Sequence, residues 1–225
     1  MKHSTSKTTI HHLMILDESG SMQNIRTETI TAFNELMSHN KNLVADHPDQ
    51  AHFLSFFTFN GKGIRTVCFA QPLSETVLLH AENYKPDDNT PLYDALGSAI
   101  LKMKHEIFGK PDTHVLVTVF TDGLENASRE FSGKEIKQMV EELKAQGWAF
   151  TYLGTDHDVN ATADSIAFGK GARSYWEKTN VSDAVNLMHH TRMVYSMKVH
   201  EDAGDFEELL LEAEKRKKKK DPENK

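Results

Sequence analysis

Four apolar stretches constrain the fold of this sequence more than any other feature. They are HHLMIL (11–16), HFLSFFTF (52–59), HVLVTVF (114–120) and WAFTYLG (148–154). Several of them are continuously apolar, whereas a strand with one face in water alternates apolar and polar residues. Continuous apolar strands are typical of a parallel sheet covered on both faces, so the rest of the chain has to supply the covering layers.

Helical patterns lie between these stretches. Two sets of apolar residues repeat at helical spacing: Leu96, Ala99, Ile100, Met103 and Ile107, and then Ile136, Met139, Val140 and Leu143. Ser132 and Glu135 form a capping-box pattern before the second set, and Gly147 stands just beyond it. The sequence further predicts a helix near 159–168, a short strand near 172–176 and a helix from about 182 to 200.

An NGKG turn at 60–63 joins HFLSFFTF to IRTVCF and predicts one antiparallel hairpin. Together, the elements predict an α/β fold with a doubly wound, mostly parallel central sheet, one antiparallel edge strand and helices on both faces. In such sheets, ligands bind at the carboxyl ends of the strands, where the strand order reverses. Functional residues are therefore expected directly after strands.

Length and composition predict one domain with short appendages. We expect a flexible N-terminus over 1–9, a domain over 10–200, and an acidic and then basic helix or tail over 201–225. The net charge of −7 provides no domain-wide basic surface, so no nucleic-acid partner is expected. Cys68 is the single cysteine, and neither a secretory signal nor a membrane-spanning stretch is evident, which favours a cytoplasmic protein.

Five oxygen-bearing residues follow the predicted strands or precede a predicted helix. Asp17, Ser19 and Ser21 stand at i, i+2 and i+4 in ILDESGS, Thr90 lies in DDNTPLYDAL, and Asp122 lies in FTDG. Alternate side chains of an extended chain point the same way, so the first three could converge. All five offer hard oxygen ligands, which favours Mg²⁺ first, with Mn²⁺ or Ca²⁺ as alternatives, over zinc or copper.

The charge of this ligand set suggests a use for the metal. Ser19, Ser21 and Thr90 are neutral, so if one carboxylate binds only through water the cation keeps positive charge and an open coordination position. An acidic side chain of a protein partner would satisfy both.

Each of these residues also has an ordinary structural interpretation. Thr90 stands directly before a proline, as helix N-caps often do, and Ser21 could cap the helix that follows it. Asp122 with the next glycine could form a plain turn, and Ser19 could belong to a serine turn. The metal interpretation depends on all three segments occurring together.

DESGS, TPLYDAL and FTDG resemble the three motifs of the von Willebrand factor type A (VWA) domain. The resemblance covers roughly residues 10 to 200 and implies a metal-ion-dependent adhesion site. It implies Asp17, Ser19, Ser21, Thr90 and Asp122 as the metal residues, with Asp122 or Asp17 often acting through water. It further implies a doubly wound sheet with one antiparallel edge strand, and protein binding without catalysis.

The same resemblance implies the type of partner. Intracellular members of the family commonly serve as adaptors or subunits of larger machines, including ATPase-driven ones. Small stand-alone bacterial members are similar in size, and some are associated with stress or tellurium-resistance gene clusters. We therefore expect a partner that offers Asp or Glu to the metal, within an ATPase-linked or stress-response assembly.

Two other functions remain open. A haloacid-dehalogenase-like magnesium phosphatase also begins with an aspartate after an apolar strand, but it needs a second aspartate where this chain has Ser19. A passive VWA scaffold would bind its partner through the tail instead of through the metal.

Two segments lie outside the family motifs. Asp156, His157 and Asp158 stand in a loop after a strand, where they could line the ligand face or form a second site, or where Asp158 could simply cap the next helix. The tail from about residue 201 is expected to be a solvated helix that frays, with a docking or anion-binding tail as the alternative.

Overall fold

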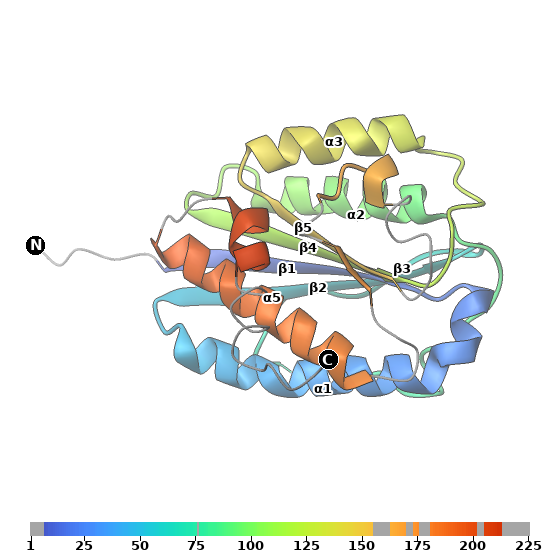
Figure 1. Ribbon diagram of the computed structural model, residues 1–225, viewed down its shortest axis with the longest axis horizontal. Coiled ribbons are helices and arrows are strands. Elements are labelled where there is room, and N and C mark those ends of the chain that lie inside the picture. The colour runs from blue at the N-terminus through green and yellow to red at the C-terminus, as the bar shows by residue number, and fades with distance from the viewer. Residues whose placement is uncertain are drawn as a thin grey trace, which may run out of the picture.

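A six-stranded sheet forms the centre of the molecule in the computed structural model, in the order β3-β2-β1-β4-β5-β6 (Figure 1). The structure describes residues 7–75, 77–154, 163–169, 173–175, 181–201 and 205–212. The strands are β1 (Thr8–Asp17), β2 (Gln50–Asn60), β3 (Gly63–Pro72), β4 (Thr113–Thr121), β5 (Ala149–Gly154) and β6 (Arg173–Tyr175). The helices are η1 (Gly20–Ile25), α1 (Arg26–Asp46), α2 (Leu92–Ile107), α3 (Gly133–Ala145) and α5 (Val181–Glu201).

The strand pairing confirms the predicted fold class. β1 pairs in parallel with β2 and β4, and the parallel set continues through β5 to β6. β3 pairs antiparallel with β2 across the predicted turn and forms an edge of the sheet. The four apolar stretches lie in β1, β2, β4 and β5, and the predicted elements near 172–176 and 182–200 appear as β6 and α5.

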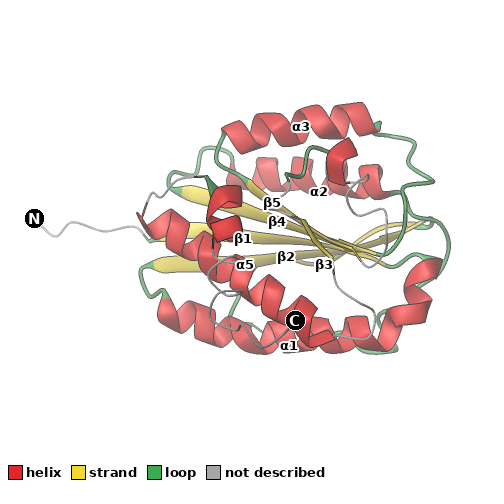
Figure 2. Cartoon of the chain, viewed as in Figure 1, coloured by secondary structure: helices red, strands yellow, loops and turns green. Residues whose placement is uncertain are grey.

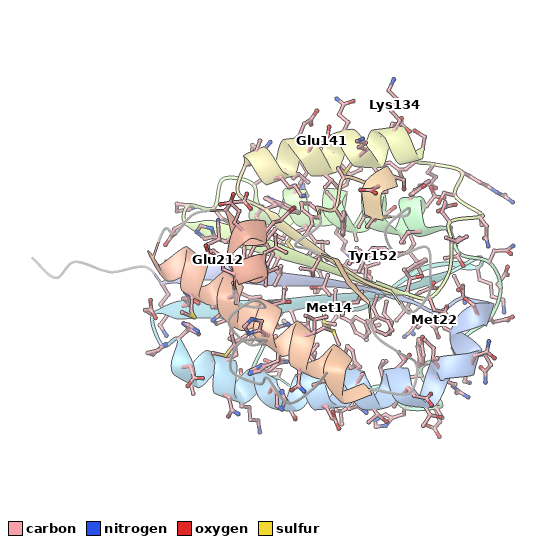
Figure 3. All side chains as sticks on the ribbon, in the orientation of Figure 1. Met14, Met22, Lys134, Glu141, Tyr152 and Glu212 are labelled. Carbon is pink, nitrogen blue, oxygen red and sulfur yellow. The ribbon has the colours of Figure 1, made fainter. Side chains whose placement is uncertain are left out.

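Helices cover both faces of the sheet, as continuous apolar strands require (Figure 2). Leu13 and Ile15 of β1 pack in one cluster with α2 and α3, and Met14 and Leu16 pack in another with α1. The alternation follows from the two-residue period of a strand. Met14, labelled in Figure 3, lies between the sheet and the layer formed by α1 and α5.

Helix α3 begins with the predicted capping box. The Ser132 hydroxyl accepts the backbone N–H of Glu135 at 3.3 Å, and the Glu135 carboxylate accepts the N–H of Ser132 at 2.8 Å. Of the helix predicted near 159–168, residues 163–165 are helical, residues 166–168 are not, and the part before residue 163 lies outside the described residues. The loop interpretations of Asp156, His157 and Asp158 lie outside the described residues.

Part of the tail is docked, which corrects the expectation of a solvated helix. Residues 206–212 are helical, and Phe206 and Leu210 are buried in a cluster with Tyr195 of α5. The rings of Tyr195 and Phe206 meet edge to face with centroids 5.3 Å apart. The apolar spacing of the tail therefore serves burial against the domain, and the basic run 215–220 lies outside the described residues.

A buried polar cluster joins β1 and β2 to α1 and α5. His12 Nε2 lies 3.1 Å from His52 Nδ1, and the buried guanidinium of Arg192 donates to Asn40 Oδ1 at 2.7 Å. None of the ion pairs found in the described part of the chain involves Arg192. Burial, with help from the charges of His47 and Arg192, lowers the pKa of His52 to about 4.

This cluster predicts that acid destabilises the fold. A histidine whose pKa is lower in the folded state than in the unfolded chain favours unfolding once it is protonated. The neutral His52 side chain therefore contributes fully to the free energy of unfolding above about pH 6.5, and this contribution is lost as the pH falls toward 4. We expect the free energy of unfolding by urea to fall by about 2 kcal/mol for His52 between pH 7.5 and 5. His52→Gln should be less sensitive to pH than the wild type, and equal sensitivity would contradict this account.

Candidate metal centre

The carboxyl ends of β1 and β4 place two aspartates at the same edge of the sheet. Leu16 of β1 is paired with Phe120 of β4, so Asp17 and Asp122 follow within two residues of this pair. Thr90 reaches the same edge from the segment before α2, and Ser19 and Ser21 lie at the start of η1.

Hydrogen bonds connect four of the five predicted residues. The Ser21 hydroxyl donates to Asp122 Oδ1 at 2.6 Å, and the hydroxyl oxygens of Ser19 and Ser21 lie 3.3 Å apart. The backbone N–H of Ser19 donates to Asp17 Oδ1 at 2.7 Å. The DESGS segment therefore folds back on its own aspartate and reaches the FTDG segment.

Gly123 shows how Thr90 joins this group. A Cβ atom added to Gly123 would lie 2.9 Å from Thr90 Oγ1, 3.3 Å from Ser21 Oγ and 3.4 Å from Asp17 Oδ2. Three oxygens from two distant segments thus surround one point beside Gly123, which itself belongs to a third segment. The structure brings all five predicted side chains together, and glycine leaves room for them.

The alternative interpretation of Thr90 as a helix cap does not agree with the structure. Helix α2 begins at Leu92, and the N–H of Tyr93 in its first turn donates to Glu125 Oε2 at 2.9 Å and to Ser128 Oγ at 3.0 Å, not to Thr90. The Thr90 backbone is instead bound to Asn126, whose Oδ1 accepts the Thr90 N–H at 2.9 Å and whose own N–H donates to Thr90 O at 3.2 Å. The Thr90 hydroxyl is therefore left to face the other ligand candidates.

The floor of the site is buried and its rim is accessible. Asp17, Ser19 and Thr90 are 0%, 1% and 3% exposed, whereas Ser21 is exposed and Asp122 is half-buried. Burial raises the pKa of Asp17 to about 6, although hydrogen bonds from Thr121 and Ser19 oppose this rise. The negative charge of Asp122 also raises the pKa, so the site holds two carboxylates with mutual repulsion that a cation would relieve.

Sequence reasoning missed two residues that hold Asp17 in place. The Thr121 hydroxyl donates to Asp17 Oδ2 at 2.5 Å and accepts the Gly123 N–H at 3.0 Å. The buried Tyr84 hydroxyl donates to the backbone oxygen of Asp17 at 2.7 Å. The position of Thr121, directly before Asp122, was a usable signal, whereas nothing in the sequence around Tyr84 indicates this contact.

The residues present fit a hard divalent cation. Two carboxylates and three hydroxyls provide only oxygen ligands, which Mg²⁺, Mn²⁺ and Ca²⁺ prefer. In the described ranges, no group of three or more His, Cys, Asp or Glu side chains is arranged to hold a metal. A histidine- or cysteine-rich site of the zinc type is thus not found in that part of the chain.

Comparison with protein families identifies the class of protein. The sequence profile of the von Willebrand factor type A domain matches residues 13–190, so the chain belongs to this family. Members of the family often mediate metal-dependent protein–protein interactions and generally act as interaction modules and not as enzymes. No curated protein sequence matches the chain.

Solved structures agree with this fold. Proximal thread matrix protein 1 from the mussel byssus aligns with a TM-score of 0.58 at 18% identity over 84% of this chain and 48% of its own. The ArnB paralog VWA2 from Sulfolobus acidocaldarius aligns with a TM-score of 0.51 at 17% identity, over 84% of this chain and 45% of its own. Manganese-loaded TRAP protein from Plasmodium vivax aligns with a TM-score of 0.50 at 15% identity, over 79% of this chain and 72% of its own. The chain spans about half the length of the first two, and these similarities concern the fold alone.

Within the described residues, no helix is long and apolar enough to cross a membrane.

The hydrogen bond from Thr121 predicts a stability difference between two buried threonines. Thr121→Val removes a donor from a buried carboxylate, so we expect a loss of about 1–3 kcal/mol of unfolding free energy. Thr151→Val is the control, because its buried hydroxyl reaches only neutral groups, Val117 O at 3.3 Å and Thr118 Oγ1 at 3.1 Å. Urea unfolding in EDTA measures the unfolding free energy of both variants. A loss for Thr151→Val equal to or larger than that for Thr121→Val would show that the hydrogen bond from Thr121 does not stabilise buried Asp17.

Proposed function

We propose that this chain is an interaction module that holds a divalent cation, most simply Mg²⁺, and captures an acidic side chain of a protein partner through it. The observation that carries this proposal is the meeting of Asp17, Ser21 and Thr90 oxygens within 3.4 Å of one point beside Gly123. Ser19 and Asp122 join them through Ser21. Membership of the VWA family supports the same conclusion.

The residues divide into a fixed floor and an open rim. Asp17, Ser19 and Thr90 are buried and would hold the cation from below, whereas Ser21 and Asp122 would hold it from the accessible side. A bound cation would supply positive charge and a coordination position for the partner's carboxylate. Because three of the five ligand groups are neutral hydroxyls, the site leaves this charge available to a visiting group.

The donor set favours Mg²⁺, with Mn²⁺ or Ca²⁺ as substitutes that accept the same oxygens. The manganese-loaded Plasmodium vivax protein has a similar fold, which supports Mn²⁺ as a practical probe. We expect the partner to belong to a larger assembly, such as an ATPase-linked or stress-response complex. A single cysteine in the chain agrees with a reducing, cytoplasmic location.

The two alternative functions have less support. A haloacid-dehalogenase-like phosphatase needs a general acid at position 19, and the Ser19 hydroxyl is neither acidic enough nor free of the cluster, since it lies 3.3 Å from the Ser21 hydroxyl. Binding through the tail has to compete with the tail's own docking, because Phe206 and Leu210 are already buried against the domain. An open metal face remains the simplest binding surface.

Removal of the cation should release the partner. We expect affinity capture with the wild-type chain in Mg²⁺ to recover a partner that is reduced to background in EDTA and restored by Mg²⁺. Ser21→Ala should lose the same partner, because it removes an exposed ligand with little effect on the core. Ser38→Ala is the matched control, since its exposed hydroxyl donates to Glu35 O on the surface of α1 at 2.6 Å. Recovery of the same proteins in EDTA would contradict the metal bridge.

A further inference from the structure

Glu18 is a buried acidic residue between two of the candidate metal ligands. It is 8% exposed, and both of its carboxylate oxygens are engaged. Oε2 accepts Nη2 of Arg65 at 2.9 Å, and Oε1 accepts the backbone N–H of Lys85 at 2.7 Å. Its neighbours Asp17 and Ser19 point the other way because alternate residues of extended chain face opposite sides. Glu18 therefore does not belong to the ligand set.

The backbone of Glu18 is held from two directions as well. Its N–H donates to Phe59 O at 2.7 Å, at the end of β2, and its carbonyl accepts the N–H of Asp87 at 2.9 Å. Two residues on, the N–H of Gly20 donates to Asp88 O at 2.8 Å. The segment that carries three of the five metal residues is thus fixed to β2 and to the segment 84–88.

Arg65 links these segments to the edge of the sheet. It lies on β3, its side chain is 46% exposed against 11% for Glu18, and it also donates to Asn83 O at 2.9 Å. One guanidinium therefore connects the edge strand, the first metal segment and the segment that leads to Thr90. A planar guanidinium with several fixed donors suits this task better than an ammonium group.

We propose that Glu18 and Arg65 form a positioning pair for the metal centre, which sets Ser19 and Ser21 at the correct distance from Thr90. This inference rests on the proposed function, because it concerns the geometry of the same site. Mg²⁺ demands near-ideal octahedral geometry and short ligand distances, so small displacements of a ligand segment weaken its binding. Groups that orient ligands without touching the metal typically change metal affinity by about 10- to 100-fold.

Charge and positioning predict opposite results for Arg65. If Arg65 acts on the site only through its charge, Arg65→Gln removes a positive group near the cation and binding becomes tighter. If the pair positions the ligands, Arg65→Gln weakens binding although repulsion is reduced. The sign of this one change separates the two explanations.

The experiment is a calorimetric titration of the full chain with Mn²⁺. We expect Arg65→Gln and Glu18→Gln to bind Mn²⁺ about tenfold more weakly than the wild type. Arg65→Lys keeps the positive charge and N–H donors but not the planar guanidinium, so it should bind Mn²⁺ with an affinity between those of Arg65→Gln and the wild type. Glu207→Gln is the control, because it breaks another partly buried ion pair, between Glu207 and Lys144. Both residues of this pair line the corner between α3 and β5.

A second measurement keeps the test independent of stability. The luminescence lifetime of Tb³⁺ in H₂O and D₂O counts the water molecules on a bound ion. We expect more water on the ion in Glu18→Gln and Arg65→Gln than in the wild type, because a displaced ligand is replaced by solvent. Urea unfolding in EDTA checks that each variant is folded, and Glu18→Gln serves alone if Arg65→Gln does not fold.

The outcomes distinguish this inference from the function on which it rests. No Mn²⁺ binding by the wild-type chain would overturn the proposed function itself. If the wild type binds Mn²⁺ and Arg65→Gln binds it equally or more tightly, the positioning pair is overturned and the metal centre is not. The same holds if the wild type binds Mn²⁺ and the number of water molecules on Tb³⁺ is unchanged in Glu18→Gln.

Discussion

The parallel pairing of β1 with β4 is the constraint on which the site depends. It brings the ends of two strands separated by about a hundred residues to one edge, so that the carboxylates of Asp17 and Asp122 face a common region. The register is fixed by burial on both faces of the sheet, because a slip of one residue would reverse which side chains enter each apolar layer. The positions of Asp17 and Asp122 are therefore set by the same packing that forms the core.

Local hydrogen bonds then convert this proximity into a defined arrangement. Thr121 and Tyr84 hold Asp17 from β4 and from the loop before α2, and Asn126 holds the backbone of Thr90. Buried carboxylates are costly without a partner charge, yet Asp17 lies at 0% exposure beside a second acid. Fold stability and cation binding are thus expected to be linked at this point.

The sequence was sufficient for the fold, because continuous apolar strands, a capping box and an NGKG turn are local signals. It also predicted that the five candidate residues lie together at one edge of the sheet, and their role as metal ligands stays a prediction. The sequence could not show whether Thr90 is a metal ligand or a helix cap, because only the contact of its backbone with Asn126 distinguishes the two roles. It missed Tyr84 and the docking of Phe206, because these depend on tertiary neighbours distant in the chain.

The most direct test of the central claim is anomalous scattering from crystals grown with Mn²⁺. We expect one strong peak among Asp17, Ser19, Ser21, Thr90 and Asp122, with an accessible coordination position occupied by water or by a carboxylate of a neighbouring molecule. A peak elsewhere, or an ion fully enclosed by protein oxygens at this edge of the sheet, would contradict the account.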